Sequence, residues 1–350
     1  MTAEDRAALA AARELWAPAG VYLNTASYGL PPRPGWDALQ GALADWHAGR
    51  TSWEHWGESV DAARVSWAHL VEVDVACVAV GATVSGLVGL IAASLPDGTR
   101  VLAPDVEFTS LLFPFLVQEH RGIEVQTVPP GELAGAVDSS TDVVAFSAVQ
   151  MSSGEVADVE AILAAAAEHG AMTVCDATQA CGWLPLDARR FDVLVAAAYK
   201  WLMSPRGTAF MSLRPETLER VVPAAAGWYA AQDVHRGYFG PPLRLASEAR
   251  RLDTSPAWFS WVGTAPALEL VERIGVPAIH EHDVGLANRF RAGLELPAGD
   301  SAIVSVDRPG AADRLQAAGI VGAVRAGRLR TSWHLYNTDE DVDRVLDVLA

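Results

Sequence analysis

The chain has 350 residues, of which 51% are hydrophobic, so it can build one large and one small domain around an extensive core. Its 26 basic and 43 acidic residues give a formal net charge of -17, which argues against nucleic acid or an anionic membrane as a partner. The polar amino terminus lacks an export signal, and no apolar run reaches membrane-spanning length, so we expect a cytoplasmic protein. Three cysteines lack the spacing of metal ligands and are expected to be reduced structural thiols: Cys77, Cys175 and Cys181.

Apolar, strand-like runs alternate with Ala-rich helical stretches through most of the chain. This alternation is typical of an α/β fold with a mostly parallel, seven-stranded sheet. The expected strands are 75–80, 100–103, 123–128, 143–146, 171–175, 193–197 and 208–212, and the expected helices between them are 84–93, 111–119 and 159–168.

The carboxyl-terminal part has a different pattern, which indicates a smaller α+β domain. Its expected elements are helices at 264–274, 280–294 and 339–349 and a strand at 302–306. We therefore predict a large domain over 16–245 and a small domain over 246–350, which residues 1–15 complete.

A lysine and an aspartate stand just past two of the expected buried strands. Asp176 follows the run 171–175, and Lys200 follows the run 191–199. Open α/β sheets build their sites at the carboxyl ends of strands. Burial there lowers the pKa of a lysine and leaves a free amine able to form a Schiff base, while a carboxylate pairs with a cationic ring nitrogen. Together the two residues indicate pyridoxal phosphate (PLP), although each alone also fits a surface lysine or a helix cap.

With these residues in place, the chain resembles the class V aminotransferase family from the stretch 21–32 to the stretch 328–338. This family comprises fold-type-I PLP enzymes such as cysteine desulfurases, kynureninases, isopenicillin N epimerase-like proteins and C–S lyases. The resemblance implies that Lys200 is the Schiff-base lysine, that Asp176 is the partner of the pyridinium nitrogen, and that Gln179 donates to the ring hydroxyl oxygen.

The turn 81–86 follows a strand and opens a helix, as a cradle for the cofactor phosphate would. Its backbone N–H groups, including that of Ala82, and the positive end of the helix dipole suit a dianion, and Thr83 adds a hydroxyl. Such a turn alone is also an ordinary helix cap.

Two departures from the family pattern lie near the expected cofactor. Ala197 stands where the family usually has a Ser or Thr phosphate ligand, so one phosphate contact is missing. Phe108 stands where the family often stacks a histidine on the ring, and it can stack but cannot move protons. Tyr199 stands directly before the lysine, where the family commonly has a histidine, and its hydroxyl can reach the phosphate or a backbone group. The resemblance also implies that Ser255 reaches the phosphate of a partner subunit's cofactor, which implies a homodimer with shared active sites.

Arg330 matches the arginine that holds the α-carboxylate of an amino-acid substrate in the family, a role that suits a planar guanidinium. Asn24 is a further candidate on the substrate side. Arg206, Arg325 and Arg328 are reserve candidates, each also consistent with a surface arginine. Five tryptophans are candidates for a pocket wall or for core and interface positions: Trp53, Trp56, Trp228, Trp258 and Trp261.

Cysteine desulfurases carry a nucleophilic cysteine shortly before the carboxylate-binding arginine, yet the stretch 319–327 contains none. Persulfide transfer is therefore disfavoured. We expect a PLP-dependent, aminotransferase-type enzyme that acts on a small α-amino acid. A β-eliminating C–S lyase acting on a cysteine conjugate is the alternative, and an amino-acid epimerase or a non-catalytic PLP-fold protein remains open.

Overall fold

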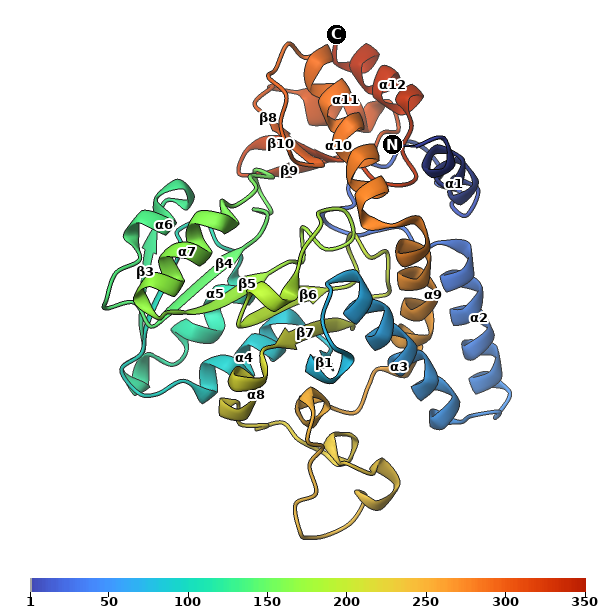
Figure 1. Ribbon diagram of the computed structural model, residues 1–350. Helices are drawn as coiled ribbons and strands as arrows, with labels where there is room; N and C mark the ends of the chain where they lie inside the picture. Colours follow the sequence, from blue (N-terminus) through green and yellow to red (C-terminus); the bar gives the residue numbers. More distant parts are fainter. Residues whose placement is uncertain (1) are drawn as a thin grey trace.

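The computed structural model describes residues 2–350, which form a larger part around a seven-stranded sheet and a smaller part around a three-stranded sheet (Figure 1). The large sheet has the strand order β1-β7-β6-β5-β4-β2-β3, and β7 alone runs antiparallel to its neighbours. The strands are β1 (Val78–Gly81), β2 (Arg100–Pro104), β3 (Glu124–Val128), β4 (Val143–Ser147), β5 (Met172–Asp176), β6 (Val193–Ala197) and β7 (Ala209–Leu213). The predicted mostly parallel, seven-stranded α/β sheet is confirmed.

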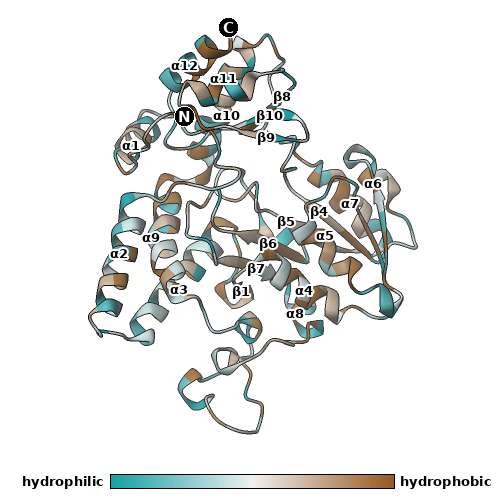
Figure 2. Cartoon of the chain, turned by 180° about the vertical axis from the view of Figure 1, so that it is seen from behind, coloured by the Kyte–Doolittle hydropathy of each residue, from teal (hydrophilic) through white to brown (hydrophobic). Residues whose placement is uncertain are grey.

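Both faces of this sheet are covered by helices, which explains why its strands read as continuous apolar runs. Successive side chains of a strand point to opposite faces. In β6, Val193 and Val195 join the core that contains α4 (Val84–Ser94) and α5 (Thr109–Leu116), whereas Leu194 and Ala196 join the core on the other face. Figure 2 shows hydrophobic strands at the centre of the molecule.

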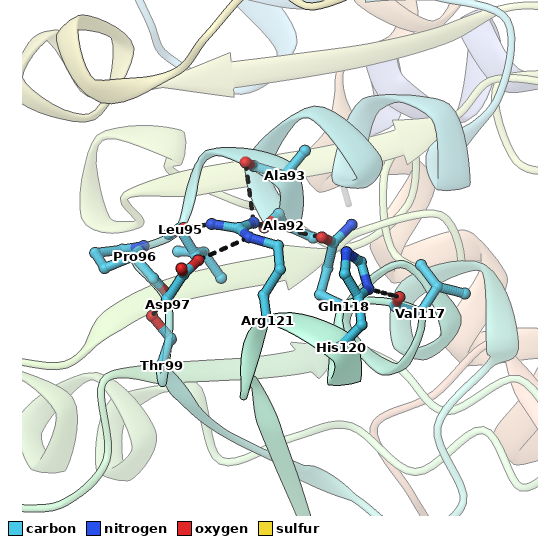
Figure 3. A network of polar contacts seen from close by, with 10 residues as sticks. All are labelled: Ala92, Ala93, Leu95, Pro96, Asp97, Thr99, Val117, Gln118, His120 and Arg121. Atoms are coloured by element: carbon cyan, nitrogen blue, oxygen red, sulfur yellow. Dashed lines mark hydrogen bonds and ion pairs between the residues drawn. The ribbon is translucent and has the colours of Figure 1, made fainter.

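Helix α4 follows β1 and is fixed at its far end by Arg121. The Nε of Arg121 donates to Asp97 Oδ1 at 2.9 Å, and its Nη1 donates to the carbonyl oxygen of Ala93 at 3.1 Å (Figure 3). Its Nη2 also donates to the carbonyl oxygen of Leu95. A cation at the carboxyl end of a helix stabilises the helix dipole. Because α4 follows β1 after a short turn, its amino end lies at the carboxyl edge of the sheet.

Three helices, α2 (Arg33–His47), α3 (Trp53–Leu70) and α9 (Trp258–Ile274), lie side by side beyond the β1 edge of the sheet (Figure 1). Aromatic contacts attach them to the strands. Trp67 of α3 stacks on Phe210 of β7 with a centroid distance of 4.8 Å, and Trp261 of α9 meets the same ring edge-on at 5.3 Å. Trp261 is therefore a core residue.

The smaller part contains an antiparallel sheet in the order β8-β10-β9, packed against helices. Its elements are β8 (Ile303–Val306), β9 (Ala323–Arg325), β10 (Arg328–Ser332), α10 (Val276–Gly293), α11 (Ala311–Ala317) and α12 (Asp339–Leu349), with α1 (Ala3–Arg13) nearby (Figure 1). Isolated bridges from Tyr22 to Val321 and from Asn24 to Ser332 attach the amino-terminal segment to this sheet. The predicted α+β character is confirmed, while the predicted domain boundaries stay predictions.

Several expected element boundaries were wrong, among them the starts of α9 and α10, which were expected at 264 and 280 and lie at Trp258 and Val276. The strand expected at 75–80 starts at Val78, because the Asp74 side chain accepts the N–H of Ala76 and forms a 3-10 turn over Val75–Cys77. The helix expected at 111–119 spans Thr109–Leu116 and is followed by a second 3-10 turn, Glu119–Arg121. The sequence pattern also missed α1, α2, α3, α11, β9, β10 and the short helices α6 (Leu133–Ala136) and α8 (Pro215–Arg220). The helix predicted at 159–168 is α7 (Val159–His169).

Within residues 2–350, no helix combines the length and the apolar character that a membrane crossing requires.

Candidate active site

Lys200 lies in the turn after β6, and it is the single lysine in the whole chain. It is 5% exposed, and its Nζ lies 5.4 Å from the centroid of the Phe108 ring and 5.7 Å from that of Tyr199. Burial lowers the pKa of its amine to about 8, against the opposing charge of Asp176. The backbone is held closely, since a Cβ at Gly29 would come 1.9 Å from the Lys200 carbonyl oxygen. A partly deprotonated amine is therefore fixed at this edge of the sheet.

Asp176 ends β5, the strand beside β6, and is 4% exposed. Its Oδ1 accepts the backbone N–H of Thr178 at 2.8 Å. Burial raises the pKa of its carboxyl to about 6, an effect that the bonds from Thr178 oppose and the nearby Glu107 increases. No cationic side chain of the described residues forms an ion pair with Asp176 within 4 Å, so this buried carboxylate can take a cationic ring nitrogen.

Glu107 is a buried carboxylate that the sequence analysis missed. Its oxygens accept the backbone N–H of Phe108 at 2.8 Å, the backbone N–H of Ser147 at 2.8 Å and the side-chain amide of Gln150 at 3.1 Å, as well as the Ser147 hydroxyl. These bonds join the turn that carries Phe108 to the end of β4, next to Asp176 in the sheet. The available signal was an acidic residue directly before Phe108, with Ser147 directly after the predicted strand 143–146.

The hydrogen bonds of Gln179 fix the orientation of its amide. The indole N–H of Trp201 donates to Gln179 Oε1 at 2.9 Å, and Gln179 Nε2 donates to the carbonyl oxygen of Ala26 at 3.0 Å. Because an indole can only donate and a carbonyl can only accept, a flipped amide would lose both bonds. One N–H of Nε2 remains for a ring hydroxyl oxygen, as the resemblance implies.

The amino end of α4 opens onto the same space. Thr83 caps the helix, with its Oγ1 accepting the N–H of Gly86 at 3.1 Å. The hydroxyl hydrogen of Thr83 and the free N–H groups of the first helical turn suit an anion such as a phosphate.

One pocket brings most of the predicted cofactor residues together. Seven of its lining residues were predicted as cofactor or catalytic residues: Ala82, Thr83, Phe108, Asp176, Gln179, Tyr199 and Lys200. The other lining residues are Val84, Ser85, Ser110, Ser147, Met151, Thr178, Ala197 and Arg206. An aromatic ring, a buried carboxylate, an amine and a helix amino end therefore face one space, which fits the ring, the ring nitrogen, the aldehyde and the phosphate of PLP.

Arg330 and Asn24 lie beside this pocket and do not line it. Arg330 is 1% exposed, and it donates to the carbonyl oxygen of Met151 at 2.7 Å, to Ser27 Oγ at 2.8 Å and to Asn24 Oδ1 at 3.3 Å. Burial lowers the pKa of its guanidinium to about 10, with a further contribution from the charge of Arg325. Arg330 thus remains cationic at neutral pH, directly behind the pocket residue Met151.

Ser255 also lies off the pocket of its own chain, where it is exposed. The segment before it is anchored firmly, since Asp253 accepts the N–H of Val80 at 2.8 Å and a bond from Arg64 Nη2 at 2.6 Å. The tryptophans considered as pocket walls do not line this pocket either. Trp53, Trp228 and Trp258 pack on one another, and Trp56 packs on Phe259.

Comparison with known proteins supports one family. The family model described as Aminotransferase class-V matches residues 81–309. An uncharacterized aminotransferase, YcbU, of Bacillus subtilis is 27% identical over 324 residues, which cover 86% of this chain and 85% of that protein. Isopenicillin N epimerase of Streptomyces clavuligerus is 28% identical over 390 residues, covering 96% of each chain.

Solved structures show the same fold. A cystine C–S lyase, C-DES, in complex with cysteine persulfide matches with a TM-score of 0.85 at 20% identity, covering 95% of this chain and 97% of that one. The cysteine desulfurase of Thermococcus onnurineus NA1 matches with a TM-score of 0.80 at 21% identity, covering 94% and 93% of the two chains.

Proposed function

Because the chain belongs to the class V aminotransferases, a family of PLP-dependent enzymes, we propose that it transfers the amino group of a small α-amino acid at the pocket around Lys200. The observation that carries this proposal is the buried Lys200 amine, whose pKa is lowered to about 8, in one pocket with Asp176 and the amino end of α4. When bound, PLP supplies an electron-withdrawing ring that weakens the bonds at the substrate Cα.

The side chains of the pocket have distinct parts in this reaction. Asp176 keeps the ring nitrogen protonated, and Gln179 orients the ring through its free N–H. Phe108 covers one ring face and excludes water without carrying a proton. Lys200 would hold the cofactor through its Nζ, and the same amine would move the proton of the substrate Cα. Arg330 would hold the α-carboxylate and so orient the bonds of the substrate Cα.

Lys200 acts as the sole base in this proposal. Among the described residues that line the pocket, the titratable side chains are Asp176, Tyr199, Lys200 and Arg206. Asp176 is reserved for the ring nitrogen, Arg206 is a cation, and burial raises the pKa of the Tyr199 hydroxyl above its usual value. A single base on one face of the cofactor ring suits transamination, which removes and returns a proton on the same side. An epimerisation that needs two bases has no support from these residues.

A β-elimination that releases a thiol from a cysteine conjugate is the second candidate, because it also needs a single base. The absence of a cysteine in 319–327 argues against persulfide transfer. The placement of the cysteines agrees, since Cys175 and Cys181 are buried in the core, Cys77 sits in the turn before β1, and none of the three lines the pocket.

The proposed enzyme is a cytoplasmic homodimer. Ser255 is exposed and lies off its own pocket, while Asp253 anchors the preceding chain, which supports a role for Ser255 at the phosphate of the partner's cofactor. Three free cysteines are consistent with a reducing compartment.

The deciding experiment mixes the PLP-loaded protein with single amino acids, cysteine conjugates included. It follows the cofactor spectrum, keto acid and thiol over time. Transamination predicts a lasting pyridoxamine phosphate spectrum, one keto acid per site, and recovery of the starting spectrum when a second keto acid is added. Continuous release of pyruvate and thiol with an unchanged final spectrum would instead identify the β-lyase. Protein that stays colourless with added PLP would end the enzyme hypothesis.

A further inference from the structure

Ala197 leaves a gap in the phosphate cradle of the proposed cofactor site. It ends β6 and lines the pocket three residues before Lys200, where its methyl group offers no hydrogen bond. Its backbone N–H is already donated to Thr178 Oγ1 at 3.0 Å. The residue at position 197 therefore offers the phosphate no hydrogen-bond donor. The donors at the amino end of α4 carry no formal charge.

Arg206 lines the same pocket and has no acidic partner. Its guanidinium carbon lies 4.9 Å from the centroid of the Tyr199 ring, and its Nη1 donates to the Tyr28 hydroxyl at 2.8 Å. Within residues 2–350, no carboxylate lies within ion-pair distance of this guanidinium. The Arg206 carbonyl oxygen accepts the hydroxyl of Ser260 at 2.9 Å, which fixes the backbone. A guanidinium placed on an aromatic ring and tethered by one neutral hydroxyl still has free N–H groups for an anion.

The charges of the pocket point to the identity of that anion. A phosphate brings close to two negative charges, and Asp176 is buried in the same pocket. Lys200 is committed to the aldehyde end of the cofactor, so Arg206 is the one remaining cation among the described lining residues. Its charge is felt inside the pocket, since it adds to the lowering of the Lys200 pKa that burial causes first.

We propose that Arg206 binds the phosphate of the cofactor and replaces the hydroxyl contact that Ala197 lacks. This inference rests on the proposed function, because it assumes that PLP occupies this pocket. Tyr199 and Tyr28 position the guanidinium, with the first beneath it and the second bonded to Nη1. Arg206 thereby contributes affinity for the phosphate and takes no part in the reaction at Cα.

The test compares PLP with pyridoxal, which has the same ring and aldehyde and no phosphate. Dissociation constants for the apo-protein are measured by quenching of tryptophan fluorescence. In Arg206→Gln the constant for PLP should rise about tenfold or more, the usual scale for a lost charge-assisted bond, while that for pyridoxal should change less than about twofold. In the double variant that carries both Arg206→Gln and Ala197→Ser, part of the lost affinity for PLP should return. The dissociation constant for pyridoxal should stay unchanged.

Arg220→Gln is the matched control, because Arg220 is exposed at the end of α8 and should leave both constants unchanged. Unchanged pyridoxal binding in Arg206→Gln would also show that the variant is folded. Equal losses for PLP and pyridoxal, or no loss for PLP, would overturn the phosphate role while leaving the proposed function intact. A wild-type protein that binds neither aldehyde would overturn the proposed function, and this inference with it.

Discussion

At the scale of single residues, the protonation of Lys200 controls whether the site can take up its cofactor. An amine attacks an aldehyde only when it is unprotonated, and burial lowers the pKa of Lys200 from 10.5 to about 8. Asp176 opposes this effect, since its negative charge favours the ammonium form. The pH dependence of cofactor capture should therefore report on both residues.

We predict that the rate at which the apo-protein captures PLP rises about tenfold per pH unit below 8 and levels off above it. In Asp176→Asn the opposing negative charge is gone, so the pKa of Lys200 falls further. The capture rate should then stop rising at a lower pH than in the wild-type protein. Above pH 6, where Asp176 is ionised, the two profiles should differ most. Absorbance of the bound cofactor after rapid mixing gives the rates.

The single lysine makes the control for this experiment simple. Reduction with borohydride can place the cofactor on just one ε-amine, that of Lys200, and Lys200→Arg should give no adduct there. Asp187→Asn removes a half-buried carboxylate that pairs with Arg189, and it should leave the profile unchanged. A wild-type rate that keeps rising to pH 10 would contradict a lowered pKa.

The sequence predicted the residues of the site better than their contacts. Asp176 and Lys200 were recognisable because each charge follows an apolar run, and the pocket brings them together with Thr83 and Phe108. The bonds of Glu107 were not recognisable, because they join a turn after β2 to the end of β4. Such contacts depend on how strands are ordered in the sheet, and the local pattern does not specify that order.

At the scale of elements, β1 joins the two segments that would contact phosphates. It leads into α4 at its carboxyl end, and its Val80 N–H donates to Asp253, which lies two residues before Ser255. Arg64 of α3 completes the arrangement by bonding Asp253 at 2.6 Å and the carbonyl oxygen of Val78 at 2.7 Å. Both ionic side chains are almost fully buried.

We predict that Asp253→Ala lowers the free energy of unfolding by about 3–5 kcal/mol, because it leaves the Arg64 charge buried without its partner. Urea unfolding of the apo-protein measures this loss. Glu58→Ala is the control, since Glu58 pairs with His55 on the exposed face of α3 and should change stability by less than about 1 kcal/mol. Similar losses in the two variants would contradict the anchoring role of Asp253.

Elements were predictable where their pattern was simple. The strands β2, β4 and β6 are apolar in the sequence because helices cover both faces of the sheet, and their predicted positions agree with the structure within a residue. Helices α2 and α3 were missed because they lack the Ala-rich pattern of the predicted helices and carry tryptophans in place of a simple apolar stripe. Trp46 and Trp56 pack on Phe259 of α9, far along the chain, although Trp36 and Trp46 of α2 stay more than half exposed.

At the scale of the whole molecule, the smaller part is attached to the turn that carries Lys200. His334 follows β10, and its Nε2 donates to the carbonyl oxygen of Trp201 at 2.9 Å, while its Nδ1 lies 2.7 Å from Asp283 Oδ2 of α10. Each nitrogen of the ring therefore faces an acceptor oxygen, one from each part of the molecule. Trp201 in turn donates to Gln179, which continues the connection to the proposed cofactor ring.

We predict that Asp283→Ala destabilises the protein by about 3–5 kcal/mol and also weakens PLP binding, because His334 loses its fully buried partner and no longer holds the turn beside Lys200. Urea unfolding and a PLP titration of the apo-protein measure the two effects. Asp343→Ala, which breaks an exposed pair with Arg289 in the same part of the molecule, should change stability by less than about 1 kcal/mol and leave PLP binding unchanged. A loss of stability in Asp283→Ala with unchanged PLP affinity would contradict this prediction. The pair of His334 and Asp283 would then stabilise the fold alone, without positioning the turn that carries Lys200.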